Sequence, residues 1–348
     1  MKKKIIFGIL AVLIFLFAFI AYKFFGPAVS TPSGEFFYIK TGSDINNVKK
    51  ELVGKKYLAG TAWFDMTSRI LKYKTVKPGR YKLKKGMSVF DLVRMLRAGN
   101  QLPVNFVITK LRTKENLSAK VGNLFECDSL QMISFLNSPD SLKPFGLDTN
   151  TAMAAAMPLT YSINWNTTPG KIFRQLYTAY KTFWNSERKQ KADSLHFSPE
   201  EIMTLASIIE EETNKKQDKL NIASVYINRL KKGMPLQADP TVKFALKNFA
   251  LRQILHGHLE TTSPYNTYIN KGLPPGPICT PSTETIDAVL DSPHTDYIYF
   301  VASSEFDGTS IFTSNYEDHL KYARLYQQKL PGYLKRVDSL RQAKKLTE

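Results

Sequence analysis

The chain is organised around one stretch, Ser198–Thr213, which reads SPEEIMTLASIIEEET. Its start has the features of a helix N-terminus. Ser198 is a good N-cap, Pro199 suits the first helical position, and Glu201 stands where a capping box needs a glutamate. The stretch therefore predicts an amphipathic helix, whose apolar stripe is formed at helical spacing by Ile202, Leu205, Ala206 and Ile209.

The end of this helix carries consecutive glutamates. At about 100° per residue, Glu210 and Glu212 fall on opposite flanks of the apolar stripe, Thr213 falls close to it, and Glu211 points towards solvent. A carboxyl group at the edge of an apolar face is partly desolvated, which raises its pKa and lets it donate a proton near neutral pH. A helix with an ordinary solvated acidic edge fits equally well, so the rest of the chain must decide.

Composition limits the class of protein. The chain has 348 residues, enough for two or three domains, and Lys and Arg outnumber Asp and Glu by 48 to 30. Such an excess suits nucleic acid, an anionic membrane or an anionic polymer. Zinc-finger, RNP-like and basic-zipper patterns are missing from the sequence, so we expect no nucleic-acid partner. The sequence leaves open whether Cys127 and Cys279 form a disulfide.

An apolar run without charges, Ile5–Tyr22, follows a cluster of lysines at residues 2–4. The run is long enough to span a bilayer, and bulky residues rather than a small-residue cleavage site follow it. A cleaved signal peptide is the competing interpretation. We predict a transmembrane signal anchor at residues 5–25, with residues 1–4 in the cytoplasm and everything after the linker at 26–34 on the outer face of the membrane.

Residues 35–125 alternate between strand and helix patterns, which predicts small α+β modules resembling LysM-like glycan-binding units. A plain spacer arm is the alternative. The predicted strands are Phe36–Lys40, Gly79–Leu83 and Val104–Thr109, and the predicted helices are Asp44–Leu52, Trp63–Lys72, Val89–Arg97 and one from about Lys114.

Residues 126–348 are predicted to form a second, mixed α+β domain. Residues 127–157 look irregular, and no function is assigned to them. The predicted helices are Pro169–Arg188, Leu220–Leu230, Glu317–Lys329 and Gly332–Lys345, and the predicted hairpin pairs Asp296–Ala302 with Thr309–Thr313.

Polar side chains suited to sugars gather beside prolines in this second domain. The segments are MPLQADPTV at residues 234–242, SPYNTY at 263–268 and KGLPPGPI at 271–278. Tyrosine rings stack on the apolar faces of pyranoses, and amides and hydroxyls bond their edges. Structural loops built from turn-forming residues are the alternative interpretation.

These segments, with ASIIEEET, ASVYINRL, YIYFVA and a later Phe-Thr-x-Asn segment, occur in an order that resembles the YceG-like family of endolytic murein transglycosylases. The likeness runs from about Glu201 to His319. One segment departs from the family pattern: residues 156–161 read AMPLTY, where a Glu-Gly pair and an aspartate are expected before Thr160 and Tyr161.

The resemblance implies a lytic transglycosylase that cleaves the β-1,4 bond between N-acetylmuramic acid and N-acetylglucosamine within strands and leaves 1,6-anhydro ends. It places the catalytic glutamate at Glu210 and implies no cofactor or metal. Peptidoglycan strands, the cytoplasmic membrane and peptidoglycan synthases are the implied partners. Predicted substrate-binding residues are Glu212, Thr213, Asn228, Gln237, Asp239, Thr241, Tyr265, Asn266, Thr267 and Tyr268.

Other functions remain open at this point. A hydrolytic muramidase would use Glu210 with Asp239 or Glu212 as base or nucleophile. A membrane-tethered peptidoglycan-binding protein would have no activity. A metal enzyme is the weakest alternative, because His256 and His258 form a His-x-His pair without a third ligand at a suitable spacing.

Overall fold

The computed structural model describes residues 2–31, 34–251 and 253–345. The chain forms two compact units whose segments alternate in sequence. The first unit combines residues 1–106, 120–129 and 161–169, and the second combines 107–119, 130–160 and 170–348. The domain boundary expected between residues 125 and 126 stays a prediction.

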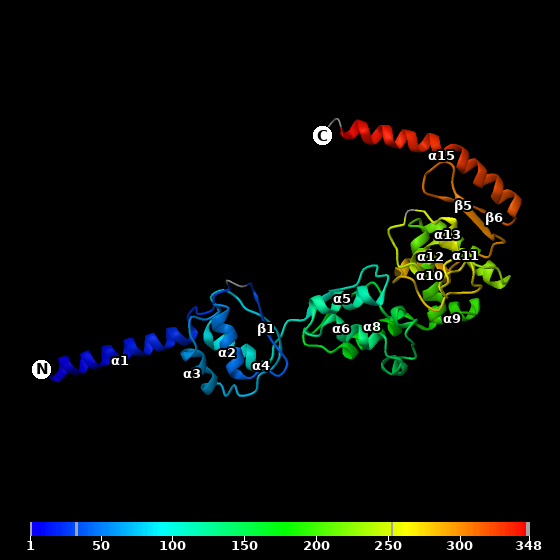
Figure 1. Ribbon diagram of the computed structural model, residues 1–348. Helices are drawn as coiled ribbons and strands as arrows, with labels where there is room; N and C mark the ends of the chain where they lie inside the picture. Colours follow the sequence, from blue (N-terminus) through cyan, green and yellow to red (C-terminus); the bar gives the residue numbers. More distant parts are fainter. Residues whose placement is uncertain (1, 32–33, 252, 346–348) are drawn as a thin grey trace. The chain divides into compact units, whose positions relative to one another are not determined.

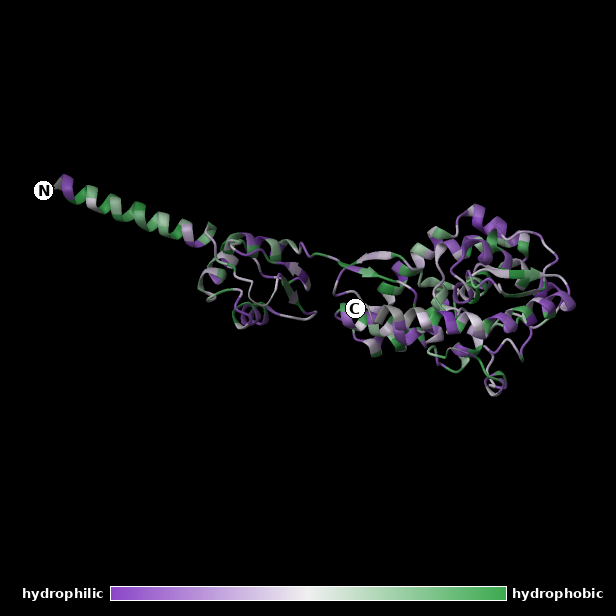
Figure 2. Ribbon diagram, turned by 90° about the horizontal axis from the view of Figure 1, so that it is seen from above, coloured by the Kyte–Doolittle hydropathy of each residue, from purple (hydrophilic) through white to green (hydrophobic). Residues whose placement is uncertain are grey.

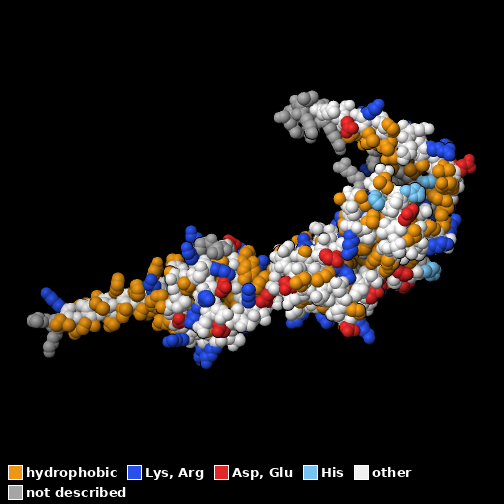
Figure 3. Space-filling model, viewed as in Figure 1, with side chains coloured by type: hydrophobic (Ala, Val, Ile, Leu, Met, Phe, Trp, Pro, Cys, Tyr) orange, Lys and Arg blue, Asp and Glu red, His pale blue; other side chains and the backbone are white. Residues whose placement is uncertain are grey.

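The apolar run forms α1 (Lys2–Phe25), which is hydrophobic along most of its length (Figure 2). Its residues 3–25 are long and apolar enough to cross a membrane, and no residue in the most apolar stretch of 18 residues is buried. No other described helix meets both conditions. At its end, the Phe24 ring lies edge-on to Trp63 with centroids 5.5 Å apart. The space-filling view shows the same exposed apolar surface (Figure 3).

The first unit is built on two antiparallel strands, β1 (Phe36–Ile39) and β2 (Gly79–Lys82), in which Phe37 is opposite Tyr81. Helices α2 (Ile45–Gly54), α3 (Ala62–Ile70) and α4 (Val89–Ala98) complete it. Asp44 and Ser88 accept backbone N–H bonds at the starts of α2 and α4, which is why these helices begin there. The predicted strands and helices of this region are confirmed. Their core includes Val48, Leu52, Phe64, Leu92 and Leu96.

Strand β3 (Val104–Val107) pairs with β4 (Thr160–Ile163), and the chain between them is more regular than expected. The interpretation of residues 127–157 as irregular was wrong, because the segment forms short helices and turns. Their apolar side chains Met132, Leu136 and Leu142 are buried. The elements here are α5 (Lys114–Leu124), α6 (Ser129–Leu136), α7 (Pro139–Leu142) and two 3₁₀ turns, η1 (Lys143–Phe145) and η2 (Ala152–Ala155).

The helix predicted over Pro169–Arg188 is two helices, α8 (Pro169–Phe183) and α9 (Ser186–Leu195). The break has a local cause. Asn185 is extended, and its side chain accepts the N–H of Arg188 at 2.9 Å, so it caps a new helix. The aromatic stripe of α8 is core, with Phe173, Tyr180 and Trp184 buried.

Helix α10 (Pro199–Glu212) is the centre of the second unit, and its capping box at Ser198 and Glu201 is formed as predicted. It packs against α9, α11 (Lys216–Lys231), α12 (Asp239–Ala245) and α14 (Thr283–Leu290). Figure 1 shows α10 with α11 and α12 in the green-to-yellow part of the chain. Because neighbours surround it, Met203, Thr204 and Ile208 are buried as well as the predicted stripe. The helix is therefore a core helix and not an amphipathic surface helix.

The predicted hairpin is confirmed as β5 (Tyr299–Ala302) and β6 (Ser310–Thr313), in which Phe300 is opposite Phe312. A short helix, α13 (His256–Leu259), precedes it in the chain. The last two predicted helices are one continuous helix, α15 (Tyr316–Lys345), with Pro331 inside it. The Phe306 ring stacks on Tyr333 with centroids 4.2 Å apart, which holds the helix just past the proline.

Candidate functional site

The end of α10 presents its glutamates to different neighbours. Successive residues of a helix are turned by about 100°, so consecutive side chains cannot share one environment. Glu210 faces the start of α14, Glu211 faces residues 110–112, and Glu212 faces α11. Each carboxyl group therefore has its own set of contacts, and these contacts decide what each can do.

Glu210 is held by α14 and α11. Its Oε2 accepts hydrogen bonds from the Ser282 hydroxyl at 2.9 Å and from the Thr285 hydroxyl, and it lies 3.6 Å from Nζ of Lys219. Lys219 is buried, and it also bonds Glu284 at 3.2 Å. The same oxygen thus has several donors, which fasten the end of α10 to the N-terminus of α14.

Glu211 does not point to solvent, so the helical-wheel prediction for it was wrong. Its side chain is only 16% exposed and forms ion pairs with Lys110 at 3.1 Å and Arg112 at 2.8 Å. Burial by itself raises the pKa of this carboxyl, but Arg112 and Lys110 outweigh burial and lower it. The wheel failed because the segment at residues 107–113, distant in sequence, covers that side of the helix.

Glu212 lies in a more strongly desolvated environment than Glu211. Burial raises its pKa to about 7, although the Tyr226 hydroxyl, which donates to Oε1 at 2.8 Å, opposes the rise. The nearby carboxylate of Asp239 adds to the rise, and Lys243 opposes it. Such a carboxyl is partly protonated at neutral pH, as a general acid requires. Thr213, the next residue, ends the helix, and its hydroxyl accepts the N–H of Lys215 at 3.0 Å.

Asp239 begins α12 and is joined to another predicted residue, Tyr268. The Tyr268 hydroxyl donates to Oδ1 of Asp239 at 2.6 Å, and burial raises the pKa of that hydroxyl above its usual range. Gln237, just before, is exposed with a left-handed φ of 53°. The structure therefore brings Glu212, Asp239 and Tyr268 into one neighbourhood at the ends of α10 and α12.

Four of the predicted substrate-binding residues serve the fold. Asn266 is fully buried, and its amide donates to the carbonyls of Leu259 and Thr261, both at 2.9 Å. Asn228 donates to the carbonyls of Thr295 and Tyr297. Thr241 and Thr267 are buried and bond each other at 2.8 Å. These polar atoms are used inside the protein, and a contact of these side chains with a substrate stays a prediction.

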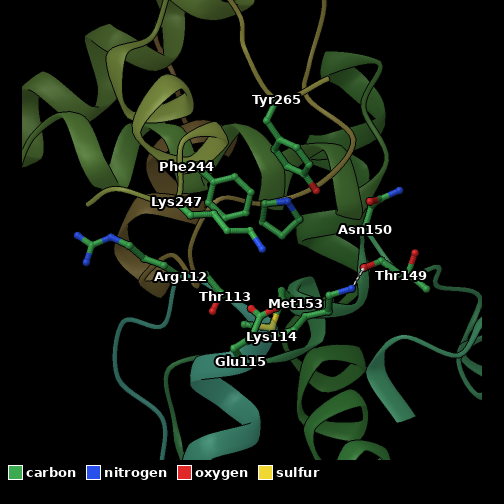
Figure 4. Close-up of a pocket in the computed structure, with 11 residues that line it drawn as sticks. Arg112, Thr113, Lys114, Glu115, Thr149, Asn150, Met153, Phe244, Lys247 and Tyr265 are labelled. Carbon is green, nitrogen blue, oxygen red and sulfur yellow. Dashed lines mark hydrogen bonds between the residues drawn. The ribbon is translucent and has the colours of Figure 1, made fainter. Parts of the chain in front are cut away.

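Tyr265 lies elsewhere, in the wall of a pocket of about 190 Å³ (Figure 4). Its ring packs on Phe244 with centroids 4.7 Å apart, and burial raises the pKa of its hydroxyl to about 12. A second pocket of about 140 Å³ shares Arg112 and Phe244 with the first and reaches Glu211 and Lys243. The two pockets thus follow α12 from Glu211 towards Tyr265.

Metal ligands are not clustered in the described part of the chain, where no group of three or more His, Cys, Asp or Glu side chains lies together. His258 accepts the N–H of Leu255 through Nδ1 and so caps α13. Cys127 and Cys279 are both buried and free. The two cysteines therefore do not form a disulfide with each other.

Sequence reasoning missed several residues around the glutamates: Lys110, Arg112, Lys219, Tyr226, Ser282 and Thr285. Tyr226 stands in the ASVYINRL segment at helical spacing, where an apolar neighbour is the usual expectation. Ser282 shows a signal that a search for N-caps finds, since it caps α14 and accepts the N–H of Thr285. Lys110 and Arg112 carried no signal, because they lie about a hundred residues before Glu211.

Comparisons with known proteins agree on one family. The model of the YceG-like family matches residues 37–325. A Bacillus subtilis protein named endolytic murein transglycosylase is 33% identical over 278 residues, which are 74% of this chain and 75% of that protein. A Streptococcus pneumoniae R6 protein of the same name is 28% identical, and the match covers 81% of this chain but 56% of that protein. The crystal structure of a YceG-like protein of Listeria monocytogenes superposes with a TM-score of 0.56 at 26% identity, covering 82% of this chain and 97% of that one.

Proposed function

This chain belongs to the YceG-like family, and from that premise we propose that it is an endolytic murein transglycosylase, a lyase that cuts glycan strands of peptidoglycan from within. The observation that carries the chemistry is the desolvated carboxyl of Glu212, with a pKa of about 7, which follows Glu211 in the chain and has Lys243 nearby, and both of these residues line a pocket along α12. A group that is part protonated and part ionised at neutral pH suits a reaction in which one residue first gives and then takes a proton.

The reaction needs only one carboxyl group. Protonated Glu212 donates its proton to the glycosidic oxygen that leaves the muramyl anomeric carbon, and the glycosidic bond breaks. The resulting carboxylate takes the proton of the muramyl C6 hydroxyl, whose oxygen closes on the anomeric carbon as a 1,6-anhydro ring. Atoms and protons balance without water, so the second carboxylate of ordinary glycosidases is not required.

Two residues compete for the acid role. The family resemblance points to Glu210, whereas the contacts of the two side chains support Glu212. Lys219, Ser282 and Thr285 all bind the same oxygen of Glu210 and fasten it to α14. Among the described residues, Oε1 of Glu210 and Oε2 of Glu212 both lack a hydrogen-bond donor, so the two residues differ in the raised pKa of Glu212 and in the ammonium group of Lys219 beside Glu210. We therefore assign proton transfer to Glu212 and the positioning of the end of α10 to Glu210.

The finer organisation of the chain belongs to the same proposal. α1 anchors the protein in the cytoplasmic membrane with residues 1–4 inside and the catalytic unit on the outer face, as its exposed apolar length and the flanking lysines favour. Residues 35–125 form a LysM-like region that holds glycan, which the antiparallel β1–β2 pair with its helices supports. Residues 126–348 supply the catalytic domain.

Product analysis tests this function. The detergent-solubilised protein is incubated with purified glycan strands, and the released fragments are examined by mass spectrometry. We expect fragments from within the strands that end in 1,6-anhydromuramyl residues. Reducing ends in their place would identify a hydrolytic muramidase, with Asp239 as the nearest candidate base. Binding without fragments would identify a peptidoglycan-binding protein.

A further inference from the structure

The pocket beside Tyr265 has an excess of hydrogen-bond donors. Figure 4 shows Lys247 and Lys114 with their ammonium groups inside the pocket, and Tyr265 and Asn150 at its rim. Lys114 uses two of its three donor positions, on Oδ1 of Asn137 at 2.6 Å and the carbonyl of Thr149 at 3.1 Å. Within the described chain, the polar atoms of the side chains of Lys247, Tyr265 and Asn150 have no hydrogen-bond partner.

One carboxylate, Glu115, lines the pocket itself, and Asp148 precedes the lining residues Thr149 and Asn150; both are engaged by hydrogen bonds within the chain. Asp148 accepts the N–H groups of Asn150 and Thr151, both at 2.8 Å. Burial by itself raises the pKa of Glu115, but hydrogen bonds at the start of α5, together with Lys247 and Lys114, lower it. Burial lowers the pKa of Lys114, Glu115 and Asp148 raise it, and Lys247 lowers it, so the two ammonium groups repel each other and the two carboxylates offset only part of that repulsion. A bound anion relieves that repulsion.

The size and walls of the pocket narrow the choice of ligand. Its volume of about 190 Å³ is below the roughly 300 Å³ at which drug-sized ligands begin, so it suits one small group rather than a disaccharide. Phe244, Met153 and Pro277 give it apolar walls for a short aliphatic chain. Donors around an apolar slot suit a carboxylate on an amino-acid residue.

The position of the pocket connects it to the reaction. Helix α12 begins at Asp239, beside Glu212, and Lys247 follows its end. Its seven residues span about 10 Å, which a muramyl residue and the peptide on its lactyl group can bridge. A sugar bound at the end of α10 would thus place its peptide along α12 towards the pocket.

We propose that this pocket binds a free carboxylate of the peptide carried by a muramyl residue next to the cut bond, so that the enzyme prefers strands with peptides to denuded strands. The proposal rests on the proposed function and names the part of the substrate that the function leaves open. Lys247 is its specificity-determining residue, because it is exposed and has no ion pair in the described chain.

The test compares full-length wild type with Lys247→Glu and Lys247→Arg on two substrates: uncrosslinked strands with peptides, and the same strands after an amidase has removed the peptides. Lys231→Glu is the matched control, since Lys231 is an exposed lysine at the end of α11 outside the pocket. We expect Lys247→Glu to lower the ratio of kcat/KM on peptide-bearing strands to kcat/KM on denuded strands by roughly fivefold or more through KM. Arginine should restore the ratio, and the control should keep it.

The outcomes separate the two proposals. A wild-type enzyme that forms anhydro ends on both substrates, with a ratio that Lys247→Glu leaves unchanged, overturns the pocket assignment and leaves the transglycosylase. Equal losses on both substrates also overturn it, because the lactyl carboxylate of denuded strands would then be the ligand. Anhydro ends from neither substrate overturn the function itself. Circular dichroism of each variant shows whether it is folded, and Lys247→Arg supplies the folded comparison.

Discussion

The hydroxyl of Tyr226 donates a hydrogen bond of 2.8 Å to Oε1 of Glu212, which joins α11 to the last residue of α10. Tyr226 is itself almost fully buried. Because this bond fixes one carboxyl oxygen, the other is the oxygen that can exchange a proton with a bound sugar. The pair therefore combines orientation with a raised pKa, and the first two predictions depend on it.

Glu212→Gln should lower kcat/KM by about 10²–10⁴-fold, since glutamine keeps the shape but cannot give the proton. Glu210→Gln should cost about tenfold at most, because its amide carbonyl still accepts from Ser282 and Thr285. Both variants are assayed for anhydro ends on uncrosslinked strands. Near-normal activity of Glu212→Gln together with loss in Glu210→Gln would return the acid role to Glu210.

The pKa of Glu212 predicts a dependence of stability on pH. Folding raises this pKa from 4.5 to about 7, so the folded chain holds the proton more tightly than the unfolded chain. That stabilisation is complete below pH 4.5 and is lost as the pH rises through about 7. Glutamine stays neutral, so Glu212→Gln should match wild type at pH 4.5 and exceed its free energy of unfolding by about 1–3 kcal/mol at pH 8. Denaturation of both proteins at the two pH values measures this difference, and equal stability at pH 8 would contradict it.

Glu211→Gln should destabilise the second unit by about 1–3 kcal/mol, because it leaves Lys110 and Arg112 without their carboxylate. The pKa of Glu211 is lowered by these partners, so the stability is present above the ordinary pKa of 4.5 and is lost as the pH falls through the lower folded value. Thermal unfolding near pH 7 is the measurement. Glu317→Gln, an exposed glutamate at the start of α15, is the control that should change little. An unchanged melting temperature for Glu211→Gln would show that the ion pairs contribute nothing.

Asn266→Ala should lower the free energy of unfolding by about 1–3 kcal/mol, because it strips the carbonyls of Leu259 and Thr261 of their donor. The control is Gln327→Ala, which removes an exposed amide from α15. Denaturant unfolding compares the two with wild type. If Asn266→Ala is as stable as wild type but fails to cleave strands, the predicted contact of Asn266 with the substrate is supported and the structural role is refuted.

Removal of residues 1–25 should release the protein from the membrane, since they contain the apolar α1. Added protease should digest the catalytic region of the intact chain in spheroplasts, because we place that region outside. Fractionation and immunoblotting give both readouts, with a cytoplasmic protein as the control for lysis. A catalytic region that survives the protease, or a mature N-terminus near residue 27, would refute the anchor.

The sequence by itself determined the family and those local elements that have capping or hairpin signals. Capping residues set the starts of α2, α4 and α10. In each case the side chain accepts the backbone N–H of the residue three positions later, so the interaction is local and can be read from the sequence. The hairpin of β5 and β6 could be predicted because its two strands are also close together in the sequence. The ordered motifs from ASIIEEET to YIYFVA carried the family, which the match over residues 37–325 bears out.

Only the tertiary structure decided what each glutamate meets. A helical wheel gives the direction of a side chain but does not show which distant segment covers it. Residues 107–113 cover Glu211, and the Tyr226 hydroxyl bonds Glu212. The tertiary structure also buries Asn266 and Thr267. Their side chains are of types that bind sugars, but here they form hydrogen bonds within the protein. The physical reason is that burial and partner charges, which set pKa values and free donors, come from contacts between residues far apart in the sequence.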